Sequence, residues 1–183
     1  AEWAKLGLAD WQYQPVTVTG RFDNGREVHV VQALTEPKGR LGGFGFMVMT
    51  PLTTAEGWTV YVNRGFVPGD RKDPTTRAGG QLEGETTVIG LVRAPYDRAW
   101  FAPADNVGKN EWFSRDPALY AKAAGIDGGK VAPYIVDARF DPALPGGMPQ
   151  GGETVVEFPN NHLQYAVTWY GLAAALVGVF AVF

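Results

Sequence analysis

Short runs of alternating apolar and polar residues recur along the first 158 residues of the chain, and this period of two is typical of β-strands. In the run from Trp58 to Val67, for example, Val60 and Val62 alternate with Tyr61 and Asn63. We predict strands over residues 15–20, 27–34, 44–53, 58–67, 86–93, 111–114, 131–139 and 154–158. Because turn residues separate these runs and regular helices do not, we expect a mainly β fold, either an antiparallel sandwich or a partly closed barrel.

Two local signals refine this pattern. Asn24-Gly25 lies between the first two runs, and Asn-Gly in such a place is a strong hairpin signal, so we expect these two strands to pair. Asp116-Pro117 has the residues of a helix start, and Gly125 has those of a helix end. The sequence therefore predicts one short internal helix in the β fold.

The C-terminal segment has a different pattern. Residues 160–183 contain no charged residue, and none of the last twelve residues is polar. About 22 residues of helix span about 33 Å, close to the thickness of a bilayer core. A buried helix is the alternative, but a soluble helix of this length normally has a polar face. We therefore divide the chain into a β-domain over residues 1–159 and a transmembrane helix over residues 160–183.

Aromatic residues affect where this helix enters the membrane. Trp169 and Tyr170 are typical of the headgroup level, and beyond them only about 13 residues, or about 20 Å, would remain. In that case we expect the native helix to continue past Phe183. The alternative places Tyr165 and Trp169 deeper, with His162 at the membrane boundary.

The composition excludes several chemistries. The chain has no cysteine, which removes disulfides, thiolate nucleophiles and cysteine metal sites. A catalytic triad would need Ser114, the single serine, which has no nucleophile motif around it. The net charge of −3 argues against binding to nucleic acid. We expect a protein that is not an enzyme; the alternative is an enzyme that acts on an envelope substrate through carboxylates.

His162 is the candidate ligand residue. It precedes the apolar run, and Tyr165 and Trp169 share its helix face by their spacing. A helix start favours the neutral imidazole, which could bind a haem iron while the two aromatic residues pack against the porphyrin. The alternative is that His162 is an interfacial capping residue beside Asn160 and Asn161.

Arg64 is the second candidate. At the end of its strand, in Asn63-Arg64-Gly65, a guanidinium could bind a carboxylate such as a haem propionate. The alternative, which the sequence alone favours, is structural. In that interpretation Arg64 pairs with an internal acid, and Gly65 supplies a turn or bulge.

Two stretches together resemble the signature segments of a known family. The first is GFMVMTPL at residues 45–52 with VYVNRGFVP at residues 60–68, and the second is NHLQYAVTWYGLA at residues 161–173. With PVTVTGRF at residues 15–22, they resemble the Surfeit locus protein family of cytochrome c oxidase assembly factors. Members of that family usually carry Trp where Phe66 stands, and commonly Gly where Gln164 stands.

The resemblance implies two membrane helices around a domain on the periplasmic or intermembrane-space side, the first helix preceding Ala1. The Gly- and Ala-rich loops favour the bacterial inner membrane, with the domain in the periplasm. A mitochondrial inner membrane, with the domain in the intermembrane space, is the alternative. The family resemblance also implies a chaperone-like role in maturing oxidase subunit I. Haem a would be a transient cofactor, and His162 would be the family's helix histidine. The partners would be subunit I, other oxidase assembly factors and membrane lipid. A protein-binding scaffold of the cell envelope, without haem, is the alternative function.

Overall fold

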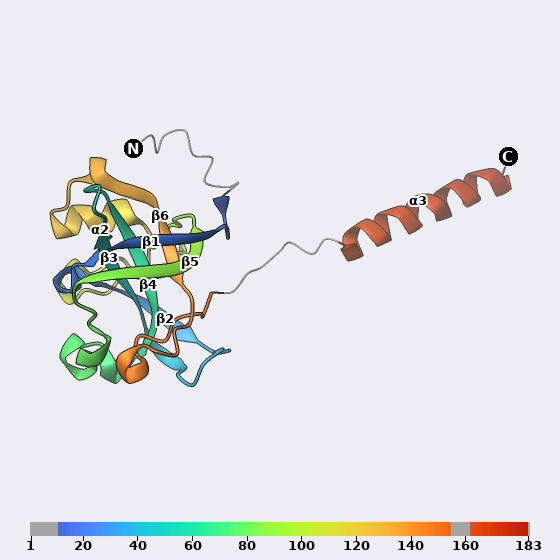
Figure 1. The fold of residues 1–183 in the computed structure, drawn as a ribbon. Helices are drawn as coiled ribbons and strands as arrows, with labels where there is room; N and C mark the ends of the chain where they lie inside the picture. The colour runs from blue at the N-terminus through green and yellow to red at the C-terminus, as the bar shows by residue number, and fades with distance from the viewer. Residues whose placement is uncertain (1–10, 155–161, 183) are drawn as a thin grey trace.

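Six strands form one sheet in the computed structural model, which describes residues 11–154 and 162–182 (Figure 1). The strands are β1 (Pro15–Phe22), β2 (Val28–Leu34), β3 (Gly43–Thr53), β4 (Thr59–Pro68), β5 (Glu85–Arg93) and β6 (Val131–Ala138). Their order is β1-β5-β6-β4-β3-β2, and a further pairing of β1 with β3 closes five of them into a barrel. The mainly β fold is confirmed in its barrel form. Pairing is antiparallel except between β4 and β6.

The hairpin predicted at Asn24-Gly25 is wrong. Among the described strands, β2 pairs with β3 alone, whereas β1 pairs with β5 and with the end of β3. Residues Asn24–Arg26 form a 3-10 turn, η2, in place of a two-residue hairpin turn. The Asn24 side chain donates to the carbonyl of Leu82 and accepts from Arg64, so it holds other segments together. The backbone of β1 therefore pairs with its barrel neighbours β5 and β3 and not with the next strand in the sequence.

The barrel interior is filled by apolar side chains from all five of its strands: Val18, Leu52, Val60, Val62, Val88, Ala132 and Val136. The predicted alternation along β4 is confirmed, because Val60 and Val62 face this interior and Tyr61 belongs to a different cluster on the other face. Both faces of β4 are buried. The period of two therefore assigns each side chain to a face, but it does not say which face meets solvent.

The predicted internal helix is confirmed as α2 (Pro117–Ala124), which covers the outer face of the sheet. The Asp116 side chain accepts from the backbone N–H of Ala118, and Gly125 ends the helix with φ of 65°. Tyr120 is fully buried and meets the rings of Tyr61 and Trp112 edge-on, with centroids 5.3 and 5.1 Å away. Through this packing, α2 covers a second apolar core on the outer face of the sheet.

One of the predicted strands is absent from the described part of the chain, and another falls almost wholly outside that part. In place of the strand predicted over 111–114, only Glu111 and Trp112 form isolated bridges, with Asn106 and Val30, because single residues rather than a whole run pair there. The strand predicted over 154–158 lies outside the described residues except for Thr154, which is in no strand.

The apolar C-terminal helix is confirmed as α3 (His162–Val182). Its residues 163–181 are long and apolar enough to cross a membrane, and this window is not buried against the rest of the protein. At about 1.5 Å per residue, the helix is about 32 Å long. Such an unpartnered apolar helix needs an apolar environment, which a bilayer provides.

Candidate functional site

A bulge in β4 directs Arg64 into the domain. The register between β3 and β4 shifts so that Met49 faces Asn63 and Val48 faces Gly65, which leaves Arg64 without a partner on β3. Gly65 has φ of +121°, and a Cβ atom there would lie 2.0 Å from the carbonyl oxygen of Gln150. Only glycine fits this conformation and this space. The predicted bulge at Gly65 is therefore confirmed.

The guanidinium of Arg64 is held by neutral groups. Arg64 is 5% exposed, and its Nη1 donates to Oδ1 of Asn24 over 3.2 Å. Its Nη2 donates to the carbonyl of Gly80, and the guanidinium carbon lies 4.6 Å from the ring centre of Phe22. None of the ion pairs in the described part of the chain includes Arg64. The internal acid expected as its structural partner is thus not found among the described residues.

Burial changes the pKa of the Arg64 guanidinium. Removal of Arg64 from water lowers its pKa to about 10, and the more distant charge of Glu27 offsets only part of that effect. A guanidinium in this position remains charged at neutral pH but lacks a direct counter-charge. A carboxylate or phosphate group would supply one with two parallel hydrogen bonds.

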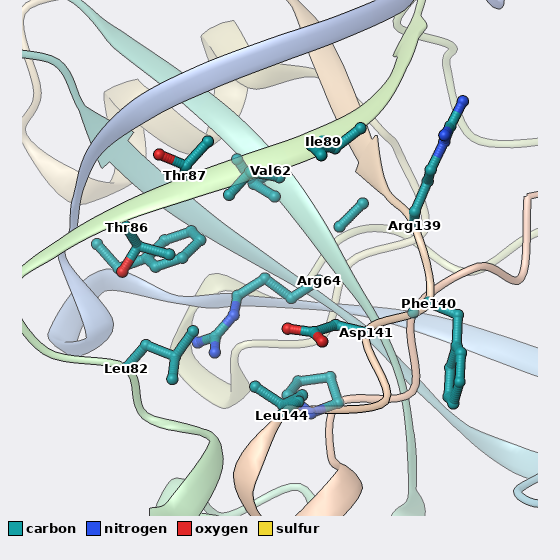
Figure 2. Close-up of a pocket in the computed structure, with 15 residues that line it drawn as sticks. Val62, Arg64, Leu82, Thr86, Thr87, Ile89, Arg139, Phe140, Asp141 and Leu144 are labelled. Carbon is teal, nitrogen blue, oxygen red and sulfur yellow. The ribbon is translucent and has the colours of Figure 1, made fainter.

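A cavity of about 370 Å³ opens beside Arg64 at one end of the barrel. Figure 2 shows the Arg64 side chain entering it from β4, with Leu82 and Leu144 beside the guanidinium. Further apolar walls come from Phe22, Val62, Val88, Ile89, Phe140 and Pro149. This volume lies in the range of small-molecule sites. Polar lining comes from Thr86, Thr87, Arg139 and Asp141, of which the two charged residues are exposed. A mainly apolar cavity with one buried cation suits a ligand with an apolar body and an acidic end.

A buried ion pair fixes the segment that supplies the Gly80 carbonyl. This segment folds through two 3-10 turns, η3 (Gly69–Arg71) and η4 (Pro74–Gly80). Within it, the side chain of Arg77 is fully buried and donates to the carboxylate of Glu27. Nε2 of His29 lies 2.7 Å from the same carboxylate.

The local charges set the ionisation of Glu27. Burial alone would raise the pKa of this carboxyl, but hydrogen bonds from His29 and Arg77, with their charges, outweigh burial and lower it. Glu27 is therefore an anion at neutral pH and pairs with Arg77. Sequence reasoning missed this pair, because its members lie 50 positions apart without a motif.

A second cavity, of about 250 Å³, lies where both described ends of the β-domain leave it, and it is lined by Tyr13 and Thr154 among others. Asp137 is 2% exposed and accepts from Asn63, Thr154 and Arg115. Its carboxylate is thus saturated with donors. This polar group ties Thr154, the last described residue of the β-domain, to β6, and no sequence signal pointed to it.

Three of the four predicted site residues lie together on α3. His162 is the first residue of the helix, although its side chain lies outside the described part, and Tyr165 and Trp169 are 64% and 69% exposed. Their spacing places them on one helix face, which is apolar and open. Arg64 lies in the β-domain, and residues 155–161 between the two parts are not described. The structure therefore groups the three helix residues with one another.

His162 and Arg64 carry the types of chemical group that bind haem. A histidine ring nitrogen is a common axial ligand of haem iron, and a buried arginine without a counter-charge suits a propionate. For a bare metal ion, by contrast, no group of three or more His, Asp or Glu side chains occurs among the described residues.

Comparison with known proteins gives consistent matches along the chain. The model of the SURF1 family matches residues 1–174. Human Surfeit locus protein 1 is 41% identical over 181 residues, covering 93% of this chain and 58% of the human protein. The chicken protein of the same name is also 41% identical, covering 93% and 57%, and a SURF1-like protein of Drosophila melanogaster is 35% identical, covering 92% and 58%. The chain spans a little over half the length of these relatives.

Proposed function

Because the chain belongs to the SURF1 family, we propose that it is a membrane-anchored assembly factor for haem–copper (cytochrome c) oxidase, which aids haem a insertion or stabilises subunit I. The β-domain stands on the periplasmic side of a bacterial inner membrane, or in the mitochondrial intermembrane space. The observation that carries the proposal is α3, an uncharged helix of membrane-spanning length whose first residue is His162. The same segment carries the family resemblance of the sequence.

The chain offers distinct groups to a bound haem a. Haem supplies an iron that takes an axial nitrogen ligand, and two propionate carboxylates. His162 would provide the ring nitrogen, and the exposed rings of Tyr165 and Trp169 would pack against the porphyrin face. Arg64 would bind a carboxylate in its mainly apolar cavity.

The test uses the full-length protein, including the first membrane helix that the family resemblance implies, purified from a host that makes haem a. We expect a Soret absorption band that is lost in His162→Ala and kept in Leu163→Ala. Leu163 is the matched control because it is the next residue and is 76% exposed on a different helix face. A colourless wild-type protein, or a band unchanged in His162→Ala, would contradict the haem part of the proposal.

A protein-binding scaffold without haem is the second candidate function. Phe44 and Phe140 favour it, because they are 67% and 62% exposed on the β-domain, and exposed large apolar side chains often mark contact sites. The same preparations separate the two functions. Subunit I that co-purifies with a colourless protein supports the scaffold, and turnover of an envelope substrate by the purified protein would contradict both.

A further inference from the structure

The segment between β5 and α2 holds two large aromatic side chains out into solvent. Trp100 is 92% exposed and Phe101 is 75% exposed, and their rings meet edge-on with centroids 5.6 Å apart. They occupy the central positions of a turn that a hydrogen bond from Ala102 N to Ala99 O closes over 2.9 Å. Nη1 of Arg98 braces the turn by donating to the Ala102 carbonyl over 2.8 Å. An ordered turn thus presents these two residues.

The base of this turn lies beside the points at which both ends of the β-domain leave it. The backbone N–H of Ala94 donates to Oε1 of Gln12 over 2.7 Å, which joins the segment to the N-terminal end. Tyr96 lines the same cavity as Tyr13 and Thr154, which joins it to the C-terminal end. The aromatic turn therefore begins at the end of the β-domain from which the chain continues to α3.

The tether is short enough to keep this end near the membrane. Thr154 precedes His162 by eight residues, and eight residues of fully extended chain span at most about 28 Å. Trp100 follows Tyr96 by four residues, so it lies at most about 14 Å from it. The turn and the start of α3 can therefore reach the same membrane surface.

We propose that the turn carrying Trp100 and Phe101 inserts into the interfacial layer of the membrane that α3 enters, where it orients the β-domain. The inference rests on the proposed anchoring by α3 and is independent of haem. Tryptophan prefers the headgroup level, and the free N–H groups of Arg98 suit a lipid phosphate. Because the exposed Asp97 balances the charge of Arg98, anionic lipid is not needed.

Lipid fits this turn better than a protein partner does. Two aromatic side chains bury about 150–250 Å² each, whereas a stable protein interface buries about 800 Å² on each partner. The two side chains alone are therefore too small a surface for a stable protein interface. Trp11 and Tyr96, 46% and 47% exposed at the same end of the domain, add further aromatic groups of the kind found at membrane surfaces.

The absence of cysteine allows a direct test with single spin labels on the full chain in phosphatidylcholine nanodiscs. A nitroxide at Ala99→Cys reports on the turn, and one at Ala174→Cys reports on α3. A third, at Ala55→Cys, lies in the exposed connection between β3 and β4, at the other end of β1 from the tether. We expect the ratio of oxygen to nickel-chelate collision rates at Ala99→Cys to exceed that at Ala55→Cys by about threefold.

Two variants in the Ala99→Cys background show whether the aromatic residues cause this effect. Trp100→Ser with Phe101→Ser should return the ratio to the Ala55→Cys value, and the fold should persist because both residues are exposed. Val107→Ser is the matched control, since it removes an exposed apolar residue from the same segment outside the turn, and should change nothing.

Every other outcome overturns the inference. A water-exposed label at Ala99→Cys, with the α3 label deep in lipid, refutes insertion of the turn and leaves the anchor intact. A water-exposed α3 label refutes the anchoring proposal itself. A label at Ala99→Cys protected from both reagents means that protein covers the turn, which also contradicts a lipid contact.

Discussion

At the scale of single residues, two buried arginines of the β-domain stand in opposite electrostatic situations. Arg77 pairs with the carboxylate of Glu27, and both side chains are almost completely buried. Arg64 is nearly as buried but donates to an amide oxygen and a carbonyl. A buried charge with a counter-charge contributes to the fold once made, whereas one held only by neutral acceptors keeps most of its desolvation penalty. A bound ligand therefore explains the burial of the Arg64 charge better than the stability of the fold does.

This contrast predicts opposite results for two matched substitutions. Arg64→Met should change the free energy of unfolding by no more than about 1 kcal/mol, because the lost hydrogen bonds are offset by removal of an unpaired buried charge. Arg77→Met should lower it by about 3–5 kcal/mol, because the buried carboxylate of Glu27 loses its arginine counter-charge and keeps only its hydrogen-bond partners His29 and Gln81. Urea unfolding of the detergent-solubilised chain measures both. A large loss in Arg64→Met would restore the structural interpretation that the sequence alone favoured.

At the scale of elements, local signals in the sequence predicted helix ends and strand faces, but not which strands pair, as the wrong hairpin at Asn24-Gly25 shows. The capping residues of α2 and the alternation in β4 act within a few positions, so both elements could be predicted. The closure of β1 on β5 joins residues about 70 positions apart, such as Val18 with Val88, and no local pattern encodes it. For the same reason the acceptors of Arg64 on η2 and η4 could not be foreseen.

The bulge in β4 predicts a difference between two glycines that share a positive φ. Gly57 has φ of +83°, and a Cβ added to it would meet no other segment within 4 Å, whereas a Cβ on Gly65 would overlap the Gln150 carbonyl. Gly57→Ala should therefore lower the free energy of unfolding by only about 1 kcal/mol, from backbone strain. Gly65→Ala should lower it by more than about 3 kcal/mol, from strain and overlap. Equal losses in chemical denaturation would show that Gln150 does not pack against the bulge.

At the scale of the whole molecule, the β-domain and α3 are stabilised by different environments. Every described buried core cluster lies within the β-domain, and the membrane-spanning window of α3 contributes no buried residue. The segment that follows β6, by contrast, is part of the domain. Gln150 exchanges two backbone hydrogen bonds with Phe66, and Glu153 accepts from the backbone N–H groups of Lys38 and Gly39. The energetic boundary of the domain therefore lies near Thr154.

Truncation at two positions tests that boundary. A chain that ends at Thr154 should unfold at nearly the same urea concentration as the full chain in detergent, because no core contact is removed. When it also starts at residue 1, without the membrane helix expected before Ala1, this truncated chain should lose most of its flotation with liposomes, since even one buried acyl chain gives only marginal membrane binding and the aromatic turn is smaller. A chain that ends at Arg139 should be clearly less stable, because it lacks the Gln150 and Glu153 contacts. If the chain ending at Thr154 unfolded at a much lower urea concentration than the full chain, α3 would have to pack on the β-domain, and its role as a membrane anchor would be in doubt.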